Sequence, residues 1–125
     1  MKCPMAVLLV DDDRDLARAA SLRLKAAGYH IHLAHDGSEG VKVARAVHPD
    51  AIVLDVRMPV MDGLKALNHL RHYRGTSDIP VVMLSASLVD QQAALGAGAR
   101  YFLTKPYQSA TLVTAVGKAI AENQK

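Results

Sequence analysis

The sequence predicts an α/β protein with a doubly wound, five-stranded parallel sheet, and three observations indicate this fold. Five short apolar runs alternate along the chain with five segments of helical periodicity. The connections are short, and each parallel crossover needs a helix such as those expected between the runs. Acidic residues follow the first and third apolar runs directly, at the sheet edge where doubly wound folds bind ligands.

The first strand and helix are predicted over residues 7–27. The run at residues 7–10 (VLLV) does not alternate with polar residues, which favours a strand buried on both faces. Asp13 is a suitable N-cap for the helix that follows, and Gly28 supplies its C-terminal stop. The expected buried face of this helix consists of Leu16, Ala20, Leu24 and Ala27.

The same alternation predicts the remaining elements. Further strands are expected at residues 31–34, 51–54, 80–84 and 101–103. Helices are expected at residues 38–47, around Leu64, Leu67 and Leu70, at 89–95 and at 109–121. The last helix carries an apolar stripe with helical spacing, made of Leu112, Val116, Ala119 and Ile120. No repeat or linker interrupts the pattern, so residues 1–125 are expected to form a single domain.

Composition excludes several classes of protein. Half of the residues are hydrophobic and 22% are charged, a balance typical of globular proteins and not of disordered chains. The net charge is +3, but the basic residues are scattered and aromatics make up only 4%, so nucleic-acid binding is not expected. The single cysteine, Cys3, cannot form an internal disulfide, and no apolar run is long enough to span a membrane. A cytoplasmic location is therefore expected.

Three carboxylates lie at the ends of neighbouring predicted strands. Asp11 and Asp12 follow the first strand and Asp55 ends the third, so the three charges repel one another unless a cation lies among them. Oxygen ligands without His or Cys favour Mg²⁺. Asp12 and Asp55 are expected to be direct ligands, with a main-chain carbonyl near Arg57 as a third.

The same sheet edge carries the residue types needed for phosphoryl transfer. Beside Mg²⁺, the Asp55 carboxylate is suited to attack a phosphorus atom. Ser85 follows the fourth strand and is expected to donate a hydrogen bond to a phosphoryl oxygen, while Lys105 follows the fifth and is expected to pair with another. These three residues are the predicted catalytic set.

Other polar residues near the predicted site are interpreted as structural. Asp13 opens a helix and is expected to cap it, and Asp62 and Gly63 are expected to order the loop after Asp55. His69 and His72 are three residues apart on a helix, but no third metal ligand is nearby in sequence, so they are expected on a solvated face.

Four short motifs follow the predicted strands in order: VDD at residues 10–12, LDVRMPVMDG at 54–63, LSA at 84–86 and LTKP at 103–106. Together they resemble the signature of response-regulator receiver domains, and the resemblance spans the whole chain. It implies a flavodoxin-like receiver fold with strand order 2-1-3-4-5, and Asp55 as the phosphoacceptor. It also implies a histidine kinase or a histidine-phosphotransfer protein as the donor.

Two features depart from the family pattern. Phe102 stands three residues before Lys105, where the family often has Tyr, and the segment between Ser85 and Lys105 is shorter than is usual. A switch is expected to run through Ser85 and Phe102 to the surface formed by the last two helices and the last strand. This surface is the expected binding face for an unidentified protein partner.

Two other functions compete with this one. A haloacid-dehalogenase-like phosphatase also forms an aspartyl-phosphate, but it needs a second acid two residues after the nucleophile, where this chain has Arg57. A flavodoxin-like nucleotide binder needs a glycine-rich turn after the first strand, where this chain has three aspartates. The preferred interpretation is a phosphoacceptor that assists its own phosphoryl transfer and dephosphorylation. Both a stand-alone receiver and a part of a longer protein remain open.

Overall fold

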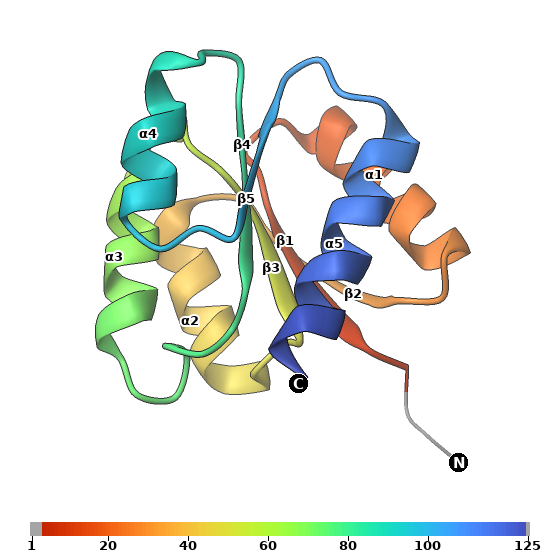
Figure 1. Cartoon of the computed structure of the whole chain (residues 1–125), viewed down its shortest axis with the longest axis horizontal. Coiled ribbons are helices and arrows are strands. Elements are labelled where there is room, and N and C mark those ends of the chain that lie inside the picture. The colour runs from red at the N-terminus through yellow and green to blue at the C-terminus, as the bar shows by residue number, and fades with distance from the viewer. Residues whose placement is uncertain (1–3, 125) are drawn as a thin grey trace.

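Five strands and five helices alternate in the computed structural model, which describes residues 4–124 (Figure 1). The strands are β1 (Ala6–Val10), β2 (His30–Ala34), β3 (Ala51–Asp55), β4 (Val81–Ser85) and β5 (Tyr101–Thr104). The helices are α1 (Arg14–Ala26), α2 (Gly37–Val47), α3 (Gly63–His72), α4 (Val89–Gly96) and α5 (Ser109–Asn123). Every predicted element is present, whereas Cys3 lies outside the described residues.

The strands form one parallel sheet in the order β2-β1-β3-β4-β5, which confirms the predicted order. The chain leaves β1 toward one edge and returns to add β3 on the other side, so the order reverses between these two strands. In their register Val10 pairs with Leu54. The residues that follow this pair, Asp11 and Asp55, therefore reach the same edge of the sheet.

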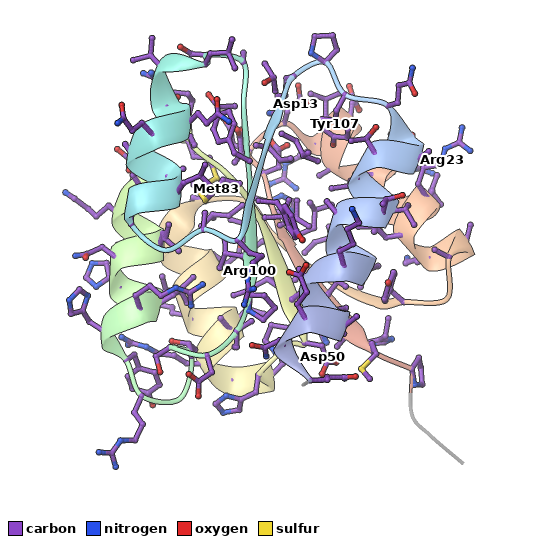
Figure 2. The ribbon with its side chains drawn as sticks, in the orientation of Figure 1. Asp13, Arg23, Asp50, Met83, Arg100 and Tyr107 are labelled. Atoms are coloured by element: carbon purple, nitrogen blue, oxygen red, sulfur yellow. The ribbon has the colours of Figure 1, made fainter. Side chains whose placement is uncertain are left out.

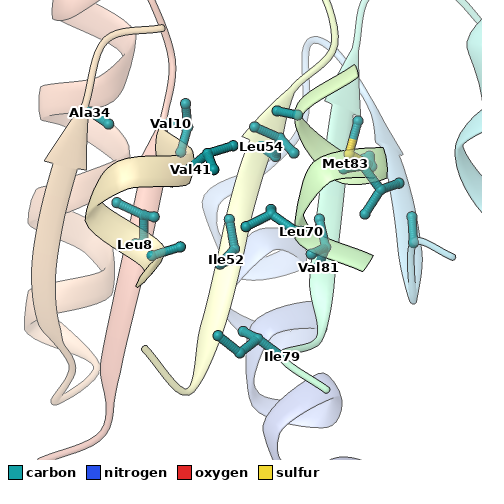
Figure 3. Close-up of a cluster of buried hydrophobic side chains, with 14 of the residues drawn as sticks. Leu8, Val10, Ala34, Val41, Ile52, Leu54, Leu70, Ile79, Val81 and Met83 are labelled. Atoms are coloured by element: carbon teal, nitrogen blue, oxygen red, sulfur yellow. The ribbon is translucent and has the colours of Figure 1, made fainter. Parts of the chain in front are cut away.

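Helices cover both faces of the sheet, with α1 and α5 on one side and α2, α3 and α4 on the other (Figure 1). Alternate residues of β1 enter two separate clusters: Leu8 and Val10 face α2 and α3, and Val7 and Leu9 face α1 and α5. Figure 3 shows the first cluster, where Val41 of α2 lies over Val10 and Leu54. The prediction that the first strand is buried on both faces is confirmed, since residues 7–10 are at most 1% exposed.

The buried face of α1 differs from the predicted stripe. The helix buries Ala17, Ala20, Ser21 and Leu24, whereas Leu16 is 48% exposed and Ala27 follows the last helical turn. A face at positions i, i+3, i+4 and i+7 satisfies the helical period as well as the predicted one, and packing selects between them. On α5 the predicted stripe of Leu112, Val116, Ala119 and Ile120 is buried as expected. Among residues 4–124, no helix combines the length and apolar character needed to cross a bilayer.

Gly63 places the start of α3 directly against the end of β3. A Cβ atom at this position would overlap the Asp55 carbonyl oxygen and the Cα of Val56. The Gly63 N–H donates to the Val56 carbonyl at 2.8 Å, which closes the loop between the two elements. Asp62 caps the helix by accepting the Lys65 N–H at 2.9 Å, as predicted.

We expect Gly63→Ala to lower the free energy of unfolding by about 1 to 3 kcal/mol, because the added methyl group meets backbone atoms that have no room to move. The same substitution at Gly96 is the control, since nothing lies within 4 Å of a Cβ there. Gly96→Ala should be neutral or stabilise by up to about 1 kcal/mol, because alanine favours helix. Urea denaturation measures both, and equal effects would contradict the role given to Gly63.

Candidate functional site

Three carboxylates meet at the carboxyl ends of β1 and β3, as predicted. One oxygen atom from each of Asp11, Asp12 and Asp55 lies within 4.8 Å of the others. Asp11 and Asp55 are buried, at 2% and 4% exposure, whereas Asp12 is exposed. Among the described residues, no other group of His, Cys, Asp or Glu side chains has this arrangement. We call these three residues the acidic cluster.

Asp13 adjoins the acidic cluster but performs a different task. Its carboxylate accepts the N–H groups of Asp15 and Leu16, each at 3.1 Å, and so caps α1. Its own N–H donates to Asp11 Oδ1 at 3.0 Å. In Figure 2, Asp13 lies toward the upper end of the view, where β1 finishes, and Asp50 lies at the opposite end. The prediction that Asp13 is a cap is confirmed.

Lys105 brings the one ammonium group that contacts the acidic cluster in the described part of the chain. Its Nζ lies 3.0 Å from Asp55 Oδ2 and 3.6 Å from Asp11 Oδ2. Its backbone N–H donates to the Ser85 carbonyl at 2.8 Å, which ties the end of β5 to the end of β4. Burial disfavours the charged amine, but the hydrogen bond and charge of Asp55, helped by Asp11, outweigh it and raise the pKa of Lys105.

The same crowding acts on the Asp55 carboxylate. The pKa of Asp55 is raised from 3.8 to about 6, and burial is the largest cause of this increase. The hydrogen bond and charge of Lys105 oppose this increase, and the charges of Asp11 and Asp12 add to it. Without a further cation, burial therefore holds the pKa of Asp55 well above the ordinary value for an aspartate.

Ser85 lies at the end of β4, one residue beyond the Asp55–Leu84 pair, and is fully buried. Its hydroxyl donates to Asp90 Oδ2 at 2.7 Å, and the Asp90 carboxylate also accepts from Arg57 Nε and Nη2, both at 3.1 Å. The hydrogen bond from Ser85 and the ion pair with Arg57 outweigh burial and lower the pKa of Asp90. The predicted hydrogen bond from Ser85 to a phosphoryl oxygen remains a prediction.

Sequence reasoning did not identify Asp90 as a site residue. Asp90 is nevertheless only 7% exposed. An acidic residue in the first turn of a helix is ordinarily explained by the helix dipole, so the sequence offers only a weak signal for its buried contacts.

The remaining predicted residues lie as follows. Phe102 is half-buried, pairs with Met83 across β4 and β5, and packs on the cluster that lies under α2 and α3. The Tyr101 hydroxyl donates to Glu122 Oε2 at 2.6 Å. His69 and His72 are exposed, in agreement with the interpretation as a solvated face.

An apolar groove of about 460 Å³ opens beside the site, between α1 and the start of α5. Lys105 lies among its lining residues, so the groove borders the lysine that contacts the acidic cluster. Leu16, the residue that α1 leaves exposed, forms part of its wall, together with Tyr107 and Leu112. We call this feature the α1–α5 groove.

In metal-free buffer, Asp55→Asn should raise the midpoint of thermal unfolding more at pH 8 than at pH 5. The folded protein holds the Asp55 proton up to a pKa of about 6, whereas the ordinary value is 3.8. The neutral acid therefore stabilises the fold at low pH, and this stabilisation is lost as the pH rises through 6. Asparagine stays neutral throughout. An equal rise in the unfolding midpoint at both pH values would contradict a raised pKa of Asp55 in the folded protein.

The family model for the response regulator receiver domain matches residues 7–117. Transcriptional regulatory protein PrrA of Mycobacterium leprae is 43% identical over 112 residues, which cover 88% of this chain and 47% of PrrA. The chain thus spans about half the length of the curated relatives it matches.

Solved structures agree with this match. A response regulator described as putative from Chloroflexus aurantiacus is 32% identical, with a TM-score of 0.91 over 95% of this chain and 99% of its own. The receiver domain of sensor histidine kinase PA1611 from Pseudomonas aeruginosa is 30% identical, with a TM-score of 0.88 over 95% and 99%, and has a magnesium ion coordinated in its active-site cleft.

The phosphatase alternative finds no support in these comparisons. Two residues after Asp55, where that alternative needs an acid, Arg57 directs its guanidinium to Asp90. The strand order and the acidic cluster are those that the motifs led us to expect, and the family match covers nearly all of the described residues. The chain belongs to the response regulator receiver domain family.

Proposed function

We propose that Asp55 accepts a phosphoryl group from a phosphohistidine donor. The observation that carries this proposal is the setting of Asp55, a buried carboxylate 3.0 Å from the Lys105 ammonium and within 4.8 Å of two further carboxylates. Phosphoryl transfer depends mainly on positioning and on neutralising charge, and this setting supplies both. The Asp55 oxygen–phosphorus bond forms as the phosphorus–nitrogen bond of the donor histidine breaks.

The acidic cluster suits Mg²⁺ as the cofactor. Its donors are all oxygen atoms and they converge from two strand ends, which matches the preference of a hard divalent ion. We assign Asp12 and Asp55 as direct ligands, a main-chain carbonyl near Arg57 as a third, and Asp11 as a supporting carboxylate. When bound, the ion neutralises charge on the carboxylates and on the phosphoryl oxygens. The magnesium ion of the PA1611 receiver domain supports this assignment.

Three further side chains have roles in the phosphoryl transfer and in the response to it. Lys105 already contacts Asp55 Oδ2, so its ammonium group needs only a small shift to pair with a phosphoryl oxygen. Ser85 supplies a hydroxyl donor at the end of the neighbouring strand. Ser85 and Phe102 then shift in response to phosphorylation, and their movement alters the surface of α4, β5 and α5, where a protein partner binds.

The α1–α5 groove is the proposed docking place of the donor protein. A donor histidine must reach Asp55 from outside the sheet edge, and the groove leads from the protein surface to Lys105. Its largely apolar lining and the exposed Leu16 suit a protein partner more than a small anion. The donor is a histidine kinase or a histidine-phosphotransfer protein.

The proposal extends to the chain as a unit. Residues 1–125 act as one cytoplasmic receiver domain, a phosphoacceptor that assists its own phosphoryl transfer and dephosphorylation. The scattered basic residues and the few aromatics do not favour nucleic-acid binding by this domain, although relatives such as PrrA are named transcriptional regulators. Phosphorylation of this domain changes its binding to a protein partner.

Incubation with acetyl phosphate and Mg²⁺ should add one base-labile phosphoryl group, because a carboxylate set among these groups is activated for attack. Intact-protein mass spectrometry measures the gain. Asp55→Asn should remain unmodified, and the exposed Asp78→Asn, a matched change far from the acidic cluster, should be modified as fully as the unchanged protein. Full modification of Asp55→Asn would show that the acceptor is another residue.

Asp12→Ala should weaken Mg²⁺ binding by about tenfold or more, since it removes a ligand while relieving repulsion in the acidic cluster. Its unfolding midpoint in EDTA should hold or rise. The adjacent Asp13→Ala is the control: it should retain Mg²⁺ affinity but lose about 1 kcal/mol of stability with the α1 cap. Calorimetry and thermal unfolding separate the two effects, and equal loss of Mg²⁺ affinity in both variants would refute the ligand assignment.

A further inference from the structure

A third buried carboxylate lies outside the acidic cluster and has no part in the mechanism above. Asp90, in the first turn of α4, accepts from the Ser85 hydroxyl at 2.7 Å and from two nitrogens of Arg57 at 3.1 Å each. These three residues, which we call the Asp90 network, come from the end of β4, the start of α4 and the loop after β3. The network therefore joins the acceptor loop to α4.

The Ser85 hydroxyl has a single proton, and the hydrogen bond to Asp90 uses it. The Ser85 side chain is fully buried, and its oxygen already accepts the Ser87 N–H at 3.1 Å. A hydroxyl donates only one hydrogen bond. A phosphoryl oxygen on Asp55 therefore gains the Ser85 donor only if Asp90 loses it.

The attachment of α4 depends strongly on the same contact. Within this helix, all of whose residues are described, the buried side chains are Asp90 and Ala94. Leu88 at the N-cap position makes no side-chain cap hydrogen bond, and Val89 beside it is 83% exposed. Since Ala94 offers only a methyl group, Asp90 is the polar anchor of the first turn.

We propose that Asp90 is a positioning residue that competes with the phosphoryl group for the Ser85 hydroxyl, so that phosphorylation of Asp55 releases the first turn of α4. This inference rests on the proposed function. In the unphosphorylated protein the Asp90 network holds Ser85 and α4 together. After phosphorylation Ser85 turns to the phosphoryl oxygen, and the start of α4 loses its anchor.

The exchange leaves no buried charge without a partner. A phosphoryl group is more negative than a carboxylate and is a stronger acceptor for the hydroxyl. Asp90 keeps both hydrogen bonds from Arg57, whose side chain is 69% exposed and can follow it toward solvent. Arg57 therefore makes the release of Ser85 possible while keeping Asp90 ionised.

The test measures the affinity for beryllofluoride, a mimic of the phosphoryl group, in the presence of Mg²⁺ by calorimetry. We expect Asp90→Ala to bind about tenfold more tightly than the unchanged protein, because the competitor for Ser85 is gone. In a Ser85→Ala background the same change at Asp90 should have no effect. Gln91→Ala, an exposed side chain in the same turn, is the control and should bind as the unchanged protein does.

Asp90→Asn provides a variant of the same shape, and its weaker acceptor should give a smaller gain in the same direction. A further measurement needs no substitution: beryllofluoride should speed hydrogen exchange at the Ser87 and Gln91 amides, which the resting arrangement protects. Unchanged or weaker binding by the folded Asp90 variants, an equal gain without Ser85, or unchanged exchange would overturn the inference. Failure of the unchanged protein to bind beryllofluoride would instead overturn the proposed function.

Discussion

Three like charges crowded at the ends of two adjacent strands are the constraint on which the rest of this structure depends. Asp11 and Asp55 are almost fully buried, and the Lys105 ammonium is the one cationic group that contacts them among the described residues. The balance is incomplete, since the pKa of Asp55 remains raised. A site with unsatisfied negative charge suits a divalent cation, which the acidic cluster would hold through its carboxylate oxygens.

A third buried carboxylate, better balanced than Asp55, lies in the first turn of α4. Asp90 is as buried as a core residue, yet Ser85 and Arg57 satisfy it, and its pKa is lowered where that of Asp55 is raised. The two carboxylates thus represent opposite solutions to burial of charge. Ser85 lies between Asp55 and Asp90 along the chain, and its hydroxyl can donate only one hydrogen bond. The surroundings of the two carboxylates are therefore coupled through this one donor.

The sequence predicted what depends on local pattern and on strand ends. Strands buried on both faces appear as unbroken apolar runs, and a residue directly after such a run must lie at the sheet edge, as Asp55 does. The strand order came from the resemblance to a family. The burial of Asp90 could not be predicted, because it depends on how α4 meets β4 in space, and the exposure of Leu16 depends on which of two helical faces packs best against α5.

The register between β1 and β3 determines when the site can form during folding. Val10 pairs with Leu54, and only in this register do the carboxylates after them converge. A slip of one residue would turn Asp55 to the other face of the sheet. Lys105 and Ser85 come from strands added later in the chain order. A chain in which β4 and β5 have not yet joined the sheet therefore lacks the contacts of Ser85 and Lys105, and the complete site exists only where the whole sheet has formed.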